Sequence, residues 1–258
     1  MKVPGQVDNP SAISTSQADF PSDGASLRAY LARPSHKNPR GAIIVIPEAF
    51  GLNDHIRDLA RRFANAGFDA LAIDVYTRTG APDPEDMASV MSKMLALPDA
   101  QVVRDLEAGA AYLRALPNSN GRVACIGFCS GGRQTLLFAC SSRKVDAAID
   151  CWGGFVTRAS PDAETTPQRP VPVIKLIPQL ACPVLFANGA EDTNPSPEVV
   201  AQVEAAVKAA GKTATFKMFA GAGHAFLADY RPSYREKQAF ELWPQIIGFL
   251  TTHIAKAP

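Results

Sequence analysis

The sequence predicts an α/β fold in which a mostly parallel central sheet is covered by helices on both faces. Short apolar runs alternate along the chain with segments of helical period, a pattern typical of parallel strands joined by helices. The composition is that of a globular protein, because 47% of the 258 residues are hydrophobic and 20% are charged. We find no internal repeat and no long linker. A single domain is therefore expected over residues 19–258, after a loose, polar N-terminal arm at residues 1–18.

Each element is expected from its own pattern. Apolar, β-branched runs predict strands at residues 28–33, 41–47, 69–75, 122–128, 146–152, 183–188 and 213–219. Apolar residues at helical spacing predict helices near residues 54–63, 87–95, 102–113, 130–139, 198–210 and 240–254, the first with Asn53 or Asp54 as its N-cap. The methionines at 87, 91 and 94 are interpreted as core residues rather than part of a cofactor site.

Charge and cysteine content exclude several classes of function. With 26 Lys and Arg against 25 Asp and Glu, the chain has no basic field to attract nucleic acid or an anionic membrane. No apolar run reaches membrane-span length, and the N-terminus has no apolar signal-peptide core. The five cysteines are an odd number without a CxxC pair, which favours a reducing compartment and gives no metal site. We therefore expect a cytoplasmic protein with neither a nucleic-acid nor a membrane partner.

The strongest functional motif is Gly127-Phe128-Cys129-Ser130-Gly131, which lies directly between a predicted strand and a predicted helix. A nucleophile elbow has this form, because its strained turn leaves no room for side chains two residues before and after the nucleophile. The turn also places backbone N–H groups at a helix N-terminus, where they can bind an oxyanion. Cys129 is thus the candidate nucleophile; the alternative is a glycine-rich turn around a structural cysteine.

A thiol nucleophile needs a base, and the order of residues along the chain favours His224. In hydrolases with such an elbow the acid and then the histidine follow the nucleophile, the histidine after the last strand. Of the four histidines, only His224, in a glycine-rich loop after the strand at 213–219, fits this position. Glu191 and Asp192 compete for the acid, since both follow the strand at 183–188, and we choose Asp192. A loop histidine and a loop-capping carboxylate are the non-catalytic alternatives.

Glu48 is a further candidate catalytic residue. It follows the buried strand at 41–47, and a carboxylate at such a strand end is unfavourable unless it is paired. The functional interpretation is that Glu48 contacts the Cys129 thiol, and the alternative is a solvated turn residue.

Together these segments resemble the dienelactone hydrolase family, a cysteine branch of the α/β-hydrolases. The likeness runs from about residue 20 to residue 254 and is carried by IPEAFGLNDHIRDLARRFANAGFDALAIDVY, IGFCSGG, NGAEDTNPSP and GAGHAF. It implies an α/β-hydrolase fold, Cys129, Asp192 and His224 as a triad, and Glu48 as the resting partner of the thiol. It also implies an oxyanion hole at the backbone N–H groups of Ser130 and Ala49.

The resemblance implies hydrolysis of an enol lactone without a cofactor or metal, in which two arginines hold the substrate carboxylate. Arg78 occupies the first position, but the second holds Ala228, and Arg231 is the candidate substitute. Phe50 and Trp152 complete the expected substrate-binding residues. The leading hypothesis is a lactone or carboxylic ester hydrolase that acts on a small molecule. A general esterase or thioesterase, a thiol redox sensor and a non-catalytic binding protein of the same fold are the alternatives.

Overall fold

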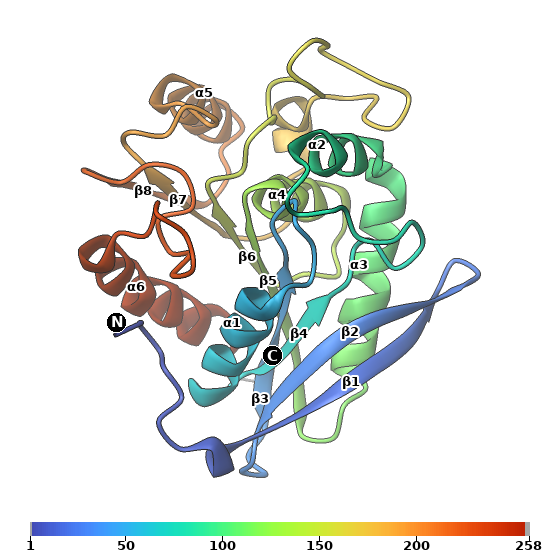
Figure 1. Cartoon of the computed structure of the whole chain (residues 1–258), viewed down its shortest axis with the longest axis vertical. Helices are drawn as coiled ribbons and strands as arrows, with labels where there is room; N and C mark the ends of the chain where they lie inside the picture. Colours follow the sequence, from blue (N-terminus) through green and yellow to red (C-terminus); the bar gives the residue numbers. More distant parts are fainter. Residues whose placement is uncertain (1, 256–258) are drawn as a thin grey trace.

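Eight strands form one sheet in the computed structural model, which describes residues 2–255 of the chain (Figure 1). Their order in the sheet is β1-β2-β4-β3-β5-β6-β7-β8. The β1–β2 and β2–β4 pairs are antiparallel and the remaining pairs are parallel. The predicted mostly parallel α/β sheet is therefore confirmed. The strands are β1 (Ile13–Ser22), β2 (Ala25–Pro34), β3 (Arg40–Ile46), β4 (Asp69–Ile73), β5 (Ser119–Phe128), β6 (Ala147–Cys151), β7 (Val184–Gly189) and β8 (Ala214–Phe219).

Helices cover both faces of this sheet. Buried side chains of α1 and α6 pack together on one face, and those of α3, α4 and α5 belong to the core on the opposite face. None of the helices described is long and apolar enough to cross a membrane. The helices are α1 (Asp54–Asn65), α2 (Met87–Ala96), α3 (Asp99–Arg114), α4 (Ser130–Ser141), α5 (Pro197–Ala209) and α6 (Glu236–Ile254), with short 3-10 helices η1 (Pro10–Ala12) and η2 (Val173–Gln179).

The central strands explain why the sheet needs both helical layers. Every residue of β3 is buried, and successive side chains belong to opposite cores: Ile43 and Val45 to the α1/α6 side, Ile44 and Ile46 to the other. Each such side chain contributes roughly 1.5–3 kcal/mol when it is fully removed from water. An uninterrupted apolar run such as that of β3 is therefore stable only as a strand covered on both sides.

The loose arm expected at residues 1–18 is wrong for its last part. Residues 13–22 form β1, which pairs along its whole length with β2 and places Ala18 and Phe20 in the core. The hairpin turn is Asp23-Gly24, both at positive φ, a geometry that Asp-Gly pairs favour. β1 is an edge strand whose other side chains are mostly exposed, so it lacks the apolar run that marks a central strand.

Candidate active site

The candidate catalytic residues lie where parallel strands end. Glu48 and Ala49 follow β3, Cys129 follows β5, Asp192 follows β7 and His224 follows β8. Because the carboxyl ends of parallel strands meet at one edge of a sheet, residues far apart in the chain converge there. Ala49, Cys129, Asp192 and His224 line one common cavity of about 350 Å³.

The turn from β5 into α4 has the geometry of a nucleophile elbow. Cys129 adopts φ 57° and ψ −117°, a strained backbone conformation for a residue with a side chain. A Cβ at position 127 would lie 2.0 Å from the Gly131 carbonyl oxygen, and one at position 131 would lie 2.4 Å from the Ile46 carbonyl oxygen. Both glycines are therefore required sterically, as the sequence motif predicts.

Cys129 also differs from the other cysteines in its exposure. It is half-buried and lines the cavity, whereas Cys125, Cys140, Cys151 and Cys182 are all buried. Burial raises the pKa of each of these four thiols, which keeps them neutral and unreactive. The accessible thiol of the chain is thus the one at the elbow.

His224 joins the thiol to a buried carboxylate. Its Nδ1 lies 2.8 Å from Oδ2 of Asp192, a side chain that is only 1% exposed. The other Asp192 oxygen accepts the Asn194 backbone N–H at 2.9 Å, which fixes the carboxylate. Of the two carboxylates that the sequence left in competition, Asp192 contacts the histidine, and Glu191 is exposed to solvent.

The charge state of His224 depends on both of its neighbours. Burial by itself lowers the pKa of His224, but hydrogen bonds to Asp192 and Cys129, together with their negative charge, outweigh burial and raise it to about 10. His224 is therefore protonated at neutral pH and lies between the Asp192 carboxylate and the Cys129 side chain.

Ser130 and Ala49, whose N–H groups are the expected oxyanion hole, both line the cavity that contains the thiol. Ser130 is the first residue of α4, so its N–H has no acceptor within the helix. Ala49 faces the same cavity, and its carbonyl oxygen accepts the Tyr76 hydroxyl at 2.9 Å. Tyr76 is buried and fixes the loop after β3, a role the sequence analysis missed because Tyr76 reaches Ala49 only through tertiary packing.

Glu48 does not make the expected contact with the thiol. Its carboxylate is 2% exposed, accepts the Tyr230 hydroxyl at 3.0 Å and lies 3.6 Å from the Arg231 guanidinium. Within residues 2–255 it forms no hydrogen bond with Cys129, and its Oε1 has no hydrogen-bond partner. The solvated-turn alternative is also excluded, since Glu48 is buried. Its partners come from the loop after His224, which packs over the β3 end.

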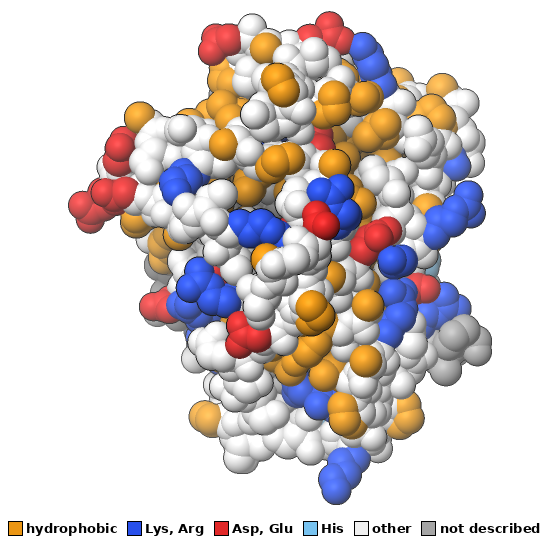
Figure 2. Space-filling view, turned by 90° about the vertical axis from the view of Figure 1, so that its right-hand side faces the viewer, with side chains coloured by type: hydrophobic (Ala, Val, Ile, Leu, Met, Phe, Trp, Pro, Cys, Tyr) orange, Lys and Arg blue, Asp and Glu red, His pale blue; other side chains and the backbone are white. Residues whose placement is uncertain are grey.

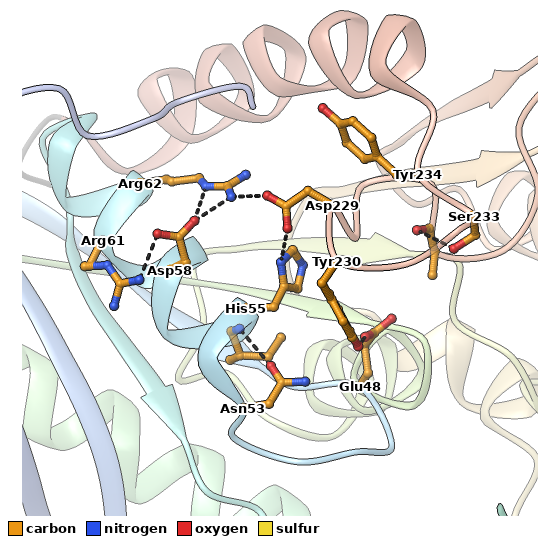
Figure 3. A network of polar contacts seen from close by, with 12 residues as sticks. Glu48, Asn53, His55, Asp58, Arg61, Arg62, Asp229, Tyr230, Ser233 and Tyr234 are labelled. Atoms are coloured by element: carbon orange, nitrogen blue, oxygen red, sulfur yellow. Dashed lines mark hydrogen bonds and ion pairs between the residues drawn. The ribbon is translucent and has the colours of Figure 1, made fainter. Parts of the chain in front are cut away.

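That loop is anchored to α1 by ion pairs (Figure 3). Asp229 pairs with Nδ1 of His55 at 3.0 Å and with Arg62, which also contacts Asp58. Partial burial alone raises the pKa of Asp229, but hydrogen bonds from His55 and Arg62 lower it to about 2. The adjacent Tyr230 lies against the His55 ring and reaches Glu48. Asp229 thus anchors the loop that places Tyr230 against Glu48 and Arg231 in the cavity wall.

The cavity has an apolar wall and several arginines. Met87, Val90, Met91 and Met94 lie at helical spacing on one face of α2 and line it, so the interpretation of these methionines as core residues is incomplete. Phe50 lines it as expected, with the Arg231 guanidinium 5.3 Å from its ring centroid. Arg133 and Arg169 also line it, and neither was a candidate from sequence. Among residues 2–255, no cluster of His, Cys, Asp or Glu is placed to hold a metal ion.

Two expected substrate-binding residues lie outside this cavity. Arg78 pairs with Asp105, donates to the Ser22 carbonyl oxygen at 2.7 Å and lines a separate small cavity between β4 and α3. Trp152 is 1% exposed and packs between Phe128 and Phe226 in the core. Both follow strand ends, but Arg78 is held by Asp105 and the Ser22 carbonyl, and the Trp152 ring packs into the core.

The parallel sheet, the elbow after β5 and the positions of Asp192 and His224 after later strands define an α/β-hydrolase. Residues 27–254 match the model of the Dienelactone hydrolase family, and the chain belongs to that family. It is therefore a dienelactone hydrolase-like hydrolase that acts on lactones or esters.

Individual relatives agree with this assignment. A protein of Salmonella typhimurium, provisionally named carboxymethylenebutenolidase, is 36% identical over 250 residues, which span 95% of this chain and 90% of that one. A Bradyrhizobium protein, provisionally named 2-oxo-3-(5-oxofuran-2-ylidene)propanoate lactonase, is 29% identical over 94% of this chain and 96% of its own length. The crystal structure of a provisionally assigned dienelactone hydrolase from Klebsiella pneumoniae superposes with a TM-score of 0.87 at 34% identity, covering 94% of this chain and all of that one.

Proposed function

We propose that the protein hydrolyses a small-molecule lactone or carboxylic ester through a Cys129–His224–Asp192 triad and an acyl-thiol intermediate. The observation that carries this proposal is the hydrogen bond from His224 to the buried Asp192 carboxylate in the cavity that the accessible elbow thiol also lines. The proposed function needs no cofactor.

The first half-reaction forms the acyl-enzyme. The Cys129 sulfur attacks the carbonyl carbon, and the carbonyl oxygen becomes an oxyanion held by the N–H groups of Ser130 and Ala49. The carbon–oxygen bond then breaks as the His224 imidazolium donates its proton to the leaving alkoxide. In a lactone this alkoxide stays attached to the acyl group. Asp192 keeps the imidazole oriented and stabilises its charged form.

The second half-reaction releases the product. Neutral His224 removes a proton from a water molecule, whose oxygen attacks the thioester carbonyl carbon. The carbon–sulfur bond breaks, the acid leaves, and the sulfur returns to its resting pairing with the imidazolium. Each half-reaction uses the same oxyanion hole, so the loop after β3 and the N-terminus of α4 serve both.

The test is hydrolysis of a panel of lactones, aryl esters and thioesters by the wild type, Cys129→Ala and Cys129→Ser. We expect Cys129→Ala to abolish turnover of every substrate and Cys129→Ser to retain a small fraction of it. Cys182→Ala is the matched control, because it removes a buried thiol outside the cavity and should leave turnover unchanged.

Mass spectrometry of the enzyme quenched during turnover of a slow ester should find the acyl mass on the peptide that contains Cys129. Iodoacetamide should label the same peptide first. Full activity in Cys129→Ala, or acylation at another residue, contradicts the proposal.

A further inference from the structure

The helix α2 presents an apolar face to the candidate active site. Four of its residues follow the i, i+3, i+4, i+7 spacing that places side chains on one face of a helix, and all four line the cavity that contains the elbow thiol: Met87, Val90, Met91 and Met94. The catalytic steps proposed above do not involve this face.

The apolar face of α2 packs apart from the two main cores. Val90 and Met94, the buried residues of α2, form a separate small cluster with Ala49, against which Phe50 and Phe155 also pack. A side chain that only fills a core is enclosed by it, whereas Met87 at the start of the same face is 55% exposed. Exposed apolar side chains gathered beside a cavity are typical of a surface that binds a ligand.

Two buried arginines fix the backbone of this wall. The Arg169 guanidinium donates to the carbonyl oxygens of Met94 and Ala159, and Nε of Arg133 donates to that of Phe155 at 3.1 Å. The Met94 carbonyl lies in the last turn of α2, where carbonyl groups have no partner within the helix. The position of the wall is thus set by its backbone. Its methionine side chains are flexible, so they can adapt to apolar groups of varied shape.

The order of the strands indicates which part of an ester this wall would contact. The wall packs against Ala49, which follows β3 on one side of β5, whereas Asp192 and His224 follow β7 and β8 on the other side. In the proposed mechanism His224 donates its proton to the leaving alkoxide, so the alcohol part of the ester lies toward His224. The acyl part is bonded to the opposite side of the same carbonyl carbon and therefore extends toward α2.

We propose that the apolar face of α2 binds the acyl group of the substrate, so that the preferred substrates are esters of medium-chain acids whose chain is apolar and carries no charge. This inference rests on the proposed hydrolytic function and adds its substrate class. The cavity has a volume of about 350 Å³. It has room for roughly ten non-hydrogen atoms, since a water molecule takes about 30 Å³ of the liquid. An acyl chain of about six to eight carbons therefore fills it together with the ester group.

The test varies the acyl chain while the leaving group stays the same. We would measure kcat/KM of the wild type for the para-nitrophenyl esters of acetate, butyrate, hexanoate and octanoate. Burial of a methylene group is favourable enough that kcat/KM should rise about two- to four-fold per methylene between acetate and hexanoate. Ethyl, butyl and hexyl acetate vary the alcohol instead, and kcat/KM should rise less steeply along that series. A flat acyl series, or a steeper alcohol series, overturns the proposal.

A substitution in the middle of the face separates contact with the acyl chain from support of the fold. Met91→Gln keeps the length of the side chain but makes its end polar, and it should lower the hexanoate-to-acetate ratio of kcat/KM about 3- to 10-fold. Met91→Leu stays apolar and should keep the wild-type ratio. Met218→Gln is the matched control, because Met218 is an exposed methionine of β8 outside the cavity. An equal fall in kcat/KM for both esters in Met91→Gln contradicts a contact with the acyl chain.

Met87→Gln makes the same change at the exposed end of the face, where folding does not depend on the side chain. It should lower the octanoate-to-acetate ratio in the same direction, and an unchanged ratio in both Met87→Gln and Met91→Gln overturns the proposal. Failure of the proposed function gives a different result. A wild type that hydrolyses no ester, lactone or thioester contradicts the hydrolytic function and this inference with it, whereas an active wild type with a flat acyl series contradicts only the role of α2.

Discussion

Two opposing effects set the pKa of His224, and the resulting pKa makes the free energy of unfolding depend on pH. Burial lowers the pKa of His224, whereas Asp192 and Cys129 raise it, and the result is about 10 against an ordinary value of 6.5. A histidine whose pKa is raised on folding contributes stability that is fully present below its unfolded pKa and is lost as the pH rises through its folded pKa. The free energy of unfolding is therefore expected to decrease between about pH 6.5 and pH 10.

Asp192→Asn tests this balance. Without the carboxylate the pKa of His224 should fall, so the free energy of unfolding should decrease less between pH 6.5 and pH 10 than it does in the wild type. Urea unfolding at several pH values in that window measures the difference. Glu191→Gln is the control, because its exposed side chain lies next to Asp192 and should leave the pH dependence as it is. If the free energy of unfolding falls equally with pH in Asp192→Asn and in the wild type, Asp192 does not raise the pKa of His224.

The candidate nucleophile, base and acid could be expected from sequence because each is tied to a local pattern. Cys129 lies within a glycine motif, and His224 and Asp192 follow apolar strands in a fixed order. Arg169 and Tyr230 have no such local pattern, since tertiary packing alone brings them to the cavity and to Glu48. Arg78 shows the converse error: its place in the sequence suggested a substrate contact, and its side chain pairs with Asp105 instead.

At the scale of the element, the room available for a side chain explains why the elbow needs glycine. Gly127 lies against the Gly131 carbonyl, whereas Gly248 on α6 has no atom within 4 Å of the position where a Cβ would be added. Gly127→Ala should lower the free energy of unfolding by about 1–3 kcal/mol or more, since the elbow backbone cannot move aside. Gly248→Ala, in a helix, should raise it by up to about 1 kcal/mol. Urea denaturation of the two variants distinguishes steric demand from a general effect of glycine; equal effects would contradict it.

The loop after β3 depends on one hydroxyl. Tyr76→Phe removes the hydrogen bond to the Ala49 carbonyl oxygen while the ring stays in place. The stability loss should be about 0.5–1.5 kcal/mol, the typical net value of one hydrogen bond. If the loop positions the Ala49 N–H for an oxyanion, kcat should fall while KM changes little, because only the transition state carries the developing charge. A raised KM with unchanged kcat would assign Tyr76 to substrate binding instead.

At the scale of the whole molecule, 26 basic residues are balanced by 25 acidic ones. On the side that carries α2 and α3, basic and acidic side chains are interspersed across the middle of the view, and hydrophobic side chains gather above them (Figure 2). This distribution agrees with a net charge of +1 and with the absence of a one-sign field on that face. Arg133, Arg169 and Arg231, which line the cavity, therefore give it a local positive character in a chain that is nearly neutral overall.

The edge of the sheet offers a direct test of where the folded part of the chain begins. Sequence pattern indicated a loose arm at residues 1–18, because its polar residues give no apolar run, but the structure uses residues 13–18 in the antiparallel pair with β2. The ring centroids of Phe20, on the same strand, and Tyr112 of α3 are 5.3 Å apart, so the hairpin also covers a helix.

Deleting residues 2–18 should remove six of the ten residue pairs between β1 and β2 and expose part of β2 as a new edge. The expected results are a lower Tm and concentration-dependent association. Deleting residues 2–9, which precede η1 and β1, should lower Tm less and leave the protein monodisperse to the same degree as the wild type. Differential scanning calorimetry and light scattering on both truncations test this prediction. An unchanged Tm for both would mean that residues 2–18 form a loose arm.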